Sequence, residues 1–100
     1  MKVIKVAATS RTSSVAGAIA GILRDDGRVE VQAIGATAVN QTLKALITAR
    51  RYLRLEGIEL RFQPKFIDAL IKGKERTVIQ FVVESVYSSD LLPYAPGFAD

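Results

Sequence analysis

The chain has 100 residues, of which 49% are hydrophobic, so a folded domain rather than a disordered segment is expected. The length supports one domain, which buries roughly 65% of the surface of the unfolded chain. Cys and His are absent, which excludes disulfides, Cys/His zinc sites and Ser-His-Asp or Cys-His catalysis. The formal net charge is +4. We therefore expect a basic binding domain without cofactor or metal, rather than an enzyme.

The N-terminus has no pattern typical of a targeting or membrane segment. Its apolar residues are interrupted by Lys2 and Lys5, whereas a signal peptide needs a continuous apolar stretch of about 7–15 residues. Nothing in the chain approaches the roughly 18 consecutive apolar residues of a membrane span. We expect a cytoplasmic protein with no membrane partner.

Two strand–helix units are predicted in the first half of the chain. Alternating apolar and polar residues predict strands over residues 2–7 and 29–34. Apolar residues at helical spacing predict helices over residues 15–24 and 36–55.

The two predicted helices each have an expected cap and one apolar stripe. We expect Ser13 or Ser14 to cap the first helix and Thr37 to cap the second. The expected buried face of the second helix consists of Val39, Leu43, Leu46, Ile47 and Leu53. Gly17 and Gly21 in the first helix predict close approach of the sheet, the second helix or another subunit.

Two further strands, over residues 58–66 and 77–83, follow in sequence, and Gly73 marks the turn between them. The order β-α-β-α-β-β predicts an α/β (α+β) two-layer sandwich, with both helices on one face of a mixed sheet. Right-handed crossovers place both helix starts at one edge of the sheet. The other face is then expected to be covered by a neighbouring subunit.

The charge pattern divides the chain into a domain, residues 1–84, and a C-terminal tail, residues 85–100. All the Lys and Arg residues lie in the first part, whereas the tail has none. The tail also contains the apolar residues Leu91, Leu92 and Tyr94. It is either a frayed terminus or an arm that docks on its own body or on a neighbour.

Four segments are candidates for binding an anionic partner. At the first helix start, hydroxyl groups surround Arg11, in a position that favours an anion; ordinary capping is the alternative. The second helix start carries polar residues, for which a solvated helix face is the alternative. The rest of that helix is basic, and the alternative is that these cations complement the helix dipole. The basic hairpin could reach a groove of nucleic acid, or it is a solvated turn. The residues singled out are Ser10, Arg11, Asn40, Gln41, Lys44, Arg51, Lys72, Lys74 and Arg76.

The chain also resembles a known family. Residues 14–24 resemble the first helix of the bacterial stage V sporulation protein S family. Residues 32–36, 38–41, 44–45 and 49–50 resemble its central motif, and residues 75–77 with 83–84 resemble its ending. Through Gly35, Asn40-Gln41 and Lys44, the chain is also similar to the wider Alba family of nucleic-acid-binding proteins.

The resemblance implies an Alba-like fold, a homodimer or higher oligomer, and binding of DNA or RNA. It implies contacts to nucleic acid from the first loop, the second helix start and the hairpin, that is from Ser10, Arg11, Asn40, Gln41, Lys44, Lys72, Lys74 and Arg76. Arg11 stands where the family has a pair of lysines. We expect a non-enzymatic regulator that binds the phosphate backbone with low sequence specificity; a sporulation role comes with the family name only.

Two other functions stay open. An oligomeric protein-interaction module that binds a protein regulator would use the glycine-rich helix, the uncovered sheet face and the apolar tail. A binder of a small phosphate compound or nucleotide would use the two helix starts.

Overall fold

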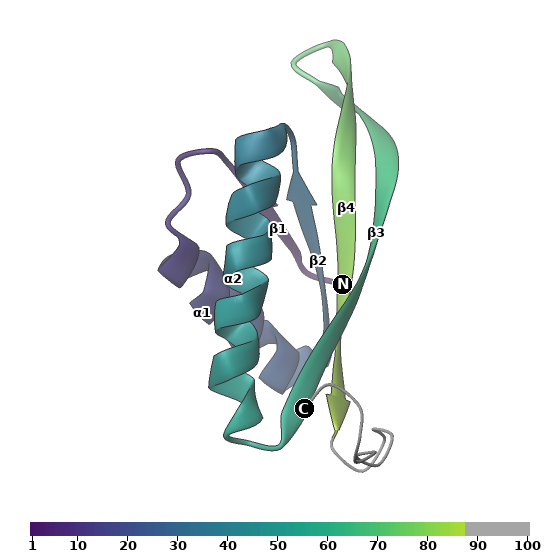
Figure 1. The fold of residues 1–100 in the computed structure, drawn as a ribbon. Coiled ribbons are helices and arrows are strands. Elements are labelled where there is room, and N and C mark those ends of the chain that lie inside the picture. The colour runs from purple at the N-terminus through teal and green to yellow at the C-terminus, as the bar shows by residue number, and fades with distance from the viewer. Residues whose placement is uncertain (88–100) are drawn as a thin grey trace, which may run out of the picture.

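The computed structural model describes residues 1–87 and confirms the predicted order of elements (Figure 1). The tail residues 88–100 lie outside the described part, whereas Ser85 to Tyr87 belong to the last strand. The elements are β1 (Val3–Val6), α1 (Thr12–Asp26), β2 (Arg28–Ala33), α2 (Ala36–Arg54), β3 (Ile58–Ile71) and β4 (Lys74–Tyr87). None of the helices in residues 1–87 is long and apolar enough to cross a membrane.

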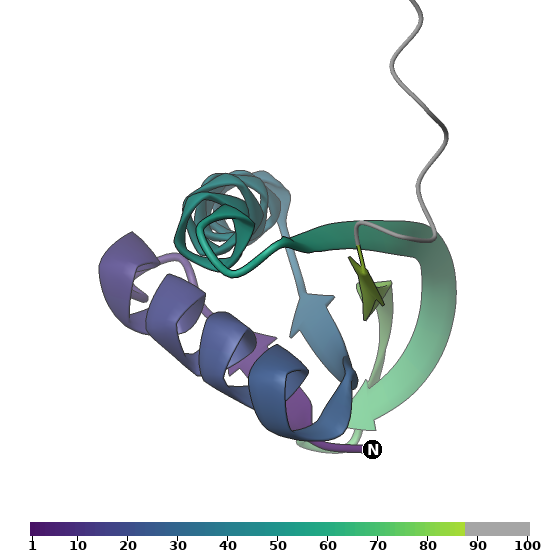
Figure 2. The ribbon, with the colours of Figure 1, turned by 90° about the horizontal axis from the view of Figure 1, so that it is seen from below.

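The four strands form one mixed sheet in the order β1-β2-β4-β3. Strands β1 and β2 are parallel, whereas β4 pairs antiparallel with both β2 and β3. Both helices lie on one face of this sheet, as predicted (Figure 2). The β3–β4 hairpin continues beyond the helices and elongates the molecule, whose extents are 51 × 28 × 22 Å (Figure 1).

The core lies between the helices and one face of the sheet. Val29, Val31 and Ala33 of β2 are fully buried there, and in the pairing register Val31 lies opposite the buried Phe81 of β4. The other face of the sheet is mixed, since it carries the polar residues Lys5, Glu30, Gln32, Lys65 and Gln80 beside the apolar residues Val3, Val78 and Val82. A sheet face with many polar residues can be exposed to solvent, and coverage of this face by a neighbouring subunit stays a prediction.

The start of α1 differs from the prediction. The helix begins at Thr12, and the residue at its N-cap is Arg11, with no side-chain hydrogen bond to the helix. Ser13 and Ser14 therefore lie inside the first turn and do not cap it. The end of α1 follows the expected chemistry, because Gly27 adopts a φ of 78° and donates its N–H to Leu23 O.

The start of α2 also lacks the expected cap. Its N-cap residue is Gly35, with a φ of 90°, and no side chain caps the helix, so the prediction for Thr37 was wrong. The positive φ is easily adopted only by glycine, and it turns the chain sharply from β2 into the helix. The first N–H groups of both helices thus remain without a side-chain acceptor.

The buried face of α2 is rotated from the predicted one. Leu46 and Leu53 are buried as expected, but Leu43 and Ile47 are 38% and 56% exposed. The buried positions are taken mostly by small residues, namely Ala38, Thr42, Ala45 and Ala49. Thr42 satisfies its hydroxyl by donating to Ala38 O at 2.9 Å. Small side chains let α2 lie close to α1 and the sheet, which leaves the two large ones outside.

The glycines of α1 do not serve close packing within this chain. A Cβ atom added at Gly17 or Gly21 would meet no heavy atom within 4 Å. The sheet and α2 are therefore excluded as the objects that these glycines admit. Of the three predicted neighbours of these glycines, only another subunit remains possible.

The hairpin is longer than predicted, because β3 and β4 have 14 residues each. Its turn is Lys72-Gly73, with φ values of 52° and 76°, the conformation of a two-residue turn that matches the twist of the strands. Pro64 lies within β3, which is possible because β3 is an edge strand and needs no N–H on its outer side. The hairpin therefore projects as a paired ribbon rather than as a loop.

Candidate nucleic-acid interface

Three of the candidate segments lie toward one end of the molecule. The loop before α1, the start of α2 and the hairpin turn all lie toward the end at which β1 and β2 finish (Figure 1). This follows from the topology, since β1 and β2 are parallel and each leads directly into its helix. The prediction that both helix starts share one edge is confirmed.

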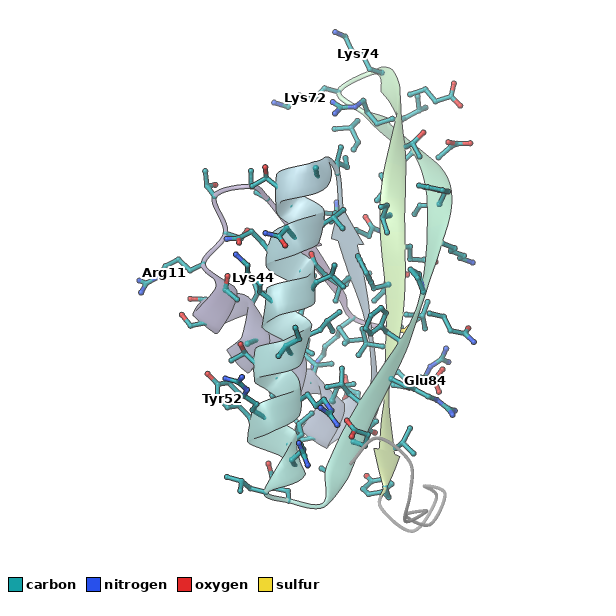
Figure 3. All side chains as sticks on the ribbon, viewed as in Figure 1. Arg11, Lys44, Tyr52, Lys72, Lys74 and Glu84 are labelled. Atoms are coloured by element: carbon teal, nitrogen blue, oxygen red, sulfur yellow. The ribbon has the colours of Figure 1, made fainter. Side chains whose placement is uncertain are left out.

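The first loop is a tight turn held by its own hydrogen bonds. Ser10 N–H donates to Ala7 O at 3.0 Å, and the Ser10 hydroxyl accepts from Ala7 N–H at 2.9 Å. Ser10 is thus a structural residue of the turn, whereas the Arg11 side chain is exposed and points away from the body (Figure 3). An Arg side chain beside uncapped helix N–H groups favours an anion such as phosphate.

A single hydrogen bond joins the first loop to the second helix. Gln41 Nε2 donates to Ser10 O at 3.0 Å, and Gln41 is partly buried. Its amide N–H group therefore braces the two helix starts against each other. One N–H of the Gln41 amide is therefore used within the fold and is not free for a ligand.

The exposed face of α2 carries Asn40, Lys44 and Arg51. The spacings of four and seven residues keep these side chains on one stripe. Lys44 lies on the same flank of the molecule as Arg11 (Figure 3). Arg51 follows Lys44 by about 10.5 Å along the helix, in the last turn, where a cation also complements the helix dipole.

The hairpin divides its basic residues between two places. Lys72 and Lys74 are exposed at the tip, beyond the start of α2 and far along the long axis from Arg11 and Lys44 (Figure 3). Arg76 lies lower, on β4, where it lines a hollow together with Lys5. The structure thus gathers Arg11 and Lys44 on one flank and keeps the hairpin tip apart from them.

Ion pairs are concentrated at the other end of the molecule. They are Lys2–Asp26 at 3.5 Å, Arg24–Glu56 at 2.8 Å, Arg50–Glu59 at 2.7 Å and Arg61–Glu84 at 3.9 Å. The guanidinium of Arg50 donates to both oxygens of Glu59 and lowers the pKa of that carboxyl group. Arg50, part of the basic stretch of α2, is therefore neutralised within the fold.

The remaining candidate cations have no such partner. Within residues 1–87, no carboxylate lies within 4.0 Å of the charged groups of Arg11, Lys44, Lys72 or Lys74. An exposed charge without a partner keeps its full attraction for an anionic ligand. These four cations toward the hairpin end are therefore unpaired among the described residues, and so are Arg51 and Arg54 in the last turn of α2, near the ion pairs.

The sequence pattern missed two features of the surface. The first is that Lys5 and Arg76, which are far apart in the sequence, line the same hollow. The alternation along β1 predicts on which face of the sheet Lys5 lies, but it does not predict that Arg76 lies near it. Leu43 and Ile47 of α2 line a hollow of about 280 Å³ with Phe62 of β3. Their exposure has no signal in the helical pattern, which predicts them to be buried.

Comparison with known proteins identifies the family and the fold. The model of the family "Stage V sporulation protein S (SpoVS)" matches residues 2–86. The structure is also similar to that of Alba from Thermoplasma volcanium, with a TM-score of 0.51 and 12% sequence identity, over 84% of this chain and 98% of that one. With the match spanning nearly all of the described residues, the chain belongs to the stage V sporulation protein S family and has an Alba-like fold.

Proposed function

We propose that this protein is a non-enzymatic regulator that binds DNA or RNA through the phosphate backbone. The observation that carries the proposal is a group of exposed cations toward the hairpin end, Arg11, Lys44, Lys72 and Lys74, which have no described carboxylate partner, whereas the four ion pairs lie at the opposite end. The Alba-like fold supports the same reading. A polyanion is the partner that such a distribution attracts over a long surface.

The two groups of cations would contact different parts of the nucleic acid. Arg11 and Lys44 would hold phosphates beside the uncapped helix starts. Lys72 and Lys74 would reach along a groove at the tip of the paired hairpin. Ser10, Asn40, Arg51 and Arg76 flank these contacts.

Low sequence specificity follows from the side chains available. Bases are read chiefly by amide and guanidinium groups placed against base edges. The Gln41 N–H group is already bonded to Ser10 O, which leaves Asn40 as the exposed amide on α2. Phosphate contacts position a protein on nucleic acid without selecting a sequence.

We also propose that two copies associate through the apolar surface formed by Leu43, Ile47 and Phe62. The hollow between these residues is rimmed by Arg50, whose charge is already balanced by Glu59. A two-fold contact would place the same apolar surface of each copy against the other. Such a dimer would carry two helix flanks and two hairpins, and so twice the number of phosphate contacts.

Fluorescence anisotropy with labelled duplex DNA, single-stranded DNA and RNA over a series of salt concentrations tests the function. Four contacts per chain predict a slope of log K against log salt of about −3.6 on duplex DNA, doubled if a dimer engages one duplex. No binding at low salt, or binding that does not depend on salt, contradicts the proposal. Arg24→Ala is the matched control, because it removes a cation that is already paired with Glu56. A protein partner captured after nuclease treatment, without any nucleic-acid binding, would favour the interaction module.

A further inference from the structure

A hollow of about 500 Å³ lies where the parallel strands end and the hairpin begins. It is formed by the ends of β1 and β2 together with the hairpin part of β3 and β4. Its volume falls in the range of roughly 300–1,000 Å³ that small-molecule sites occupy. The carboxyl ends of parallel strands are also the usual place for ligands in open α/β sheets.

Two cations and one amide supply the polar lining. Lys5 lies opposite Gln32 in the register of β1 and β2, and Arg76 comes from β4. No acidic residue lines the hollow. In the described part of the chain, neither Lys5 nor Arg76 has a carboxylate within 4.0 Å. The hollow therefore has two positive charges that form no ion pair with the described residues.

The amide of Gln32 is held in a defined orientation. Its Nε2 donates to Glu30 Oε2, and this bond is the main reason why the pKa of Glu30 is lowered. One N–H of the Gln32 amide is thus engaged, and its Oε1 accepts no hydrogen bond from any of the described residues. The hollow accordingly offers one acceptor beside its two cationic donors.

The rest of the lining is apolar. Val78, only 1% exposed, forms a buried wall, whereas Leu70 is 79% exposed at the rim. Ile34 adds a further branched side chain from the end of β2. Apolar side chains can pack against a nucleobase in pockets that take a single base.

We propose that this hollow binds one nucleoside monophosphate unit whose base carries an amino group. A phosphate monoester carries a charge of about −1.5 to −2 at neutral pH, which matches Lys5 and Arg76. The base lies against Val78 and Leu70, and its amino group donates to Gln32 Oε1. The unit is either a free nucleotide or an unpaired, 5′-phosphorylated terminal nucleotide of a bound nucleic acid, since both present a base and a phosphate monoester.

The site differs from the proposed nucleic-acid interface, and only Arg76 belongs to both. It also differs from the two helix starts, because its charges come from strands. A nucleotide in the hollow would contact β1 and the hairpin together, and would therefore fix the angle of the hairpin against the body. Binding of a nucleotide in the hollow can therefore be measured separately from binding of a long duplex.

Titration of the full chain with AMP, followed by NMR, tests the site. We expect shifts at the Gln32 side-chain amide, the Val78 methyl groups and the Lys5 amide. Lys5→Ala and Arg76→Ala should each weaken AMP binding about tenfold, whereas Lys65→Ala, a cation of the same sheet face outside the hollow, should leave it unchanged. Adenosine, inorganic phosphate and IMP should all bind more weakly than AMP.

A filling variant keeps the test independent of charge. Ala69→Leu places a larger side chain at the lining of the hollow without removing a cation, and should abolish the AMP shifts while duplex binding persists. A duplex with one unpaired, 5′-phosphorylated terminal nucleotide identifies the source. If this duplex shifts the Val78 signals and competes with AMP for the hollow, the occupant is the nucleic-acid end. If only AMP shifts them, the occupant is a free nucleotide. No shift at Gln32 and Val78 with either probe overturns the site, even if duplex binding is normal.

Discussion

The tip of the hairpin offers the sharpest test of how charge is used. Lys72 and Lys74 are exposed there, and no described carboxylate lies within 4.0 Å of either. We expect the double substitution Lys72→Asn and Lys74→Ala to remove two of four phosphate contacts per chain. The slope of log K against log salt on duplex DNA should fall from about −3.6 to about −1.8. Asn is chosen at position 72 because the φ of 52° there is one that Asn tolerates.

The assay is fluorescence anisotropy over a salt series, with circular dichroism to show that the melting temperature is retained. The matched control is Lys2→Ala with Arg24→Ala, which also removes two charges but takes them from ion pairs with Asp26 and Glu56. The control should leave the slope close to that of the wild type. An unchanged slope in the hairpin variant, or an equal fall in the control, would refute the reasoning.

The other predictions concern the proposed dimer, the hydrogen bond of Gln41, the Arg50–Glu59 ion pair and the glycines of α1. Ile47→Asp should leave the fold intact but convert the dimer to monomer in sedimentation velocity; a persistent dimer contradicts the apolar surface. Gln41→Leu removes the bond to the first loop and should weaken binding to all sequences alike, with amide exchange faster around Ser10. The pKa of Glu59 is lowered by Arg50, so the ion pair stabilises the fold at pH values above the ordinary pKa of a glutamate, and this stabilisation is lost as the pH falls through the lowered pKa. Glu59→Gln should lower the free energy of unfolding at pH 7 by about 0.5 kcal/mol or less. In urea titrations, the stability of this variant should depend less on acidic pH than that of the wild type. Gly17→Ala enters open space and should raise stability by roughly 0.5–1 kcal/mol, unless a subunit packs there, in which case mass measurements will show dissociation.

The order of elements could be predicted because each has a strong local pattern. Alternating apolar residues indicate β2, and apolar residues at helical spacing indicate α2. Gly73 indicates the turn because glycine readily adopts the positive φ that it has there. The helix starts could not be predicted as well, since hydroxyl residues suited to capping lie inside the first turn instead. Whether a hydroxyl residue caps a helix depends on the residue at which the preceding loop ends and the helix begins. That residue is determined by the tertiary fold.

The buried face of α2 shows where local pattern fails. Leu43 and Ile47 predict a buried stripe because they are large and apolar, but close helix packing selects Ala45 and Ala49. The same limit applies to the site. The chain pattern identifies Lys72 and Lys74 as a basic turn, whereas the convergence of Lys5 with Arg76 depends on contacts between distant strands.

The most direct test of the central claim is to map the bound face of the protein. NMR titration of the full chain with a short duplex at low salt should shift the backbone amides of residues 10–14, 36–44 and 72–76. The amides around Asp26, Glu56 and Glu84, at the end that holds the ion pairs, should stay in place. Shifts concentrated at that ion-paired end, or no shifts at all, would contradict the account.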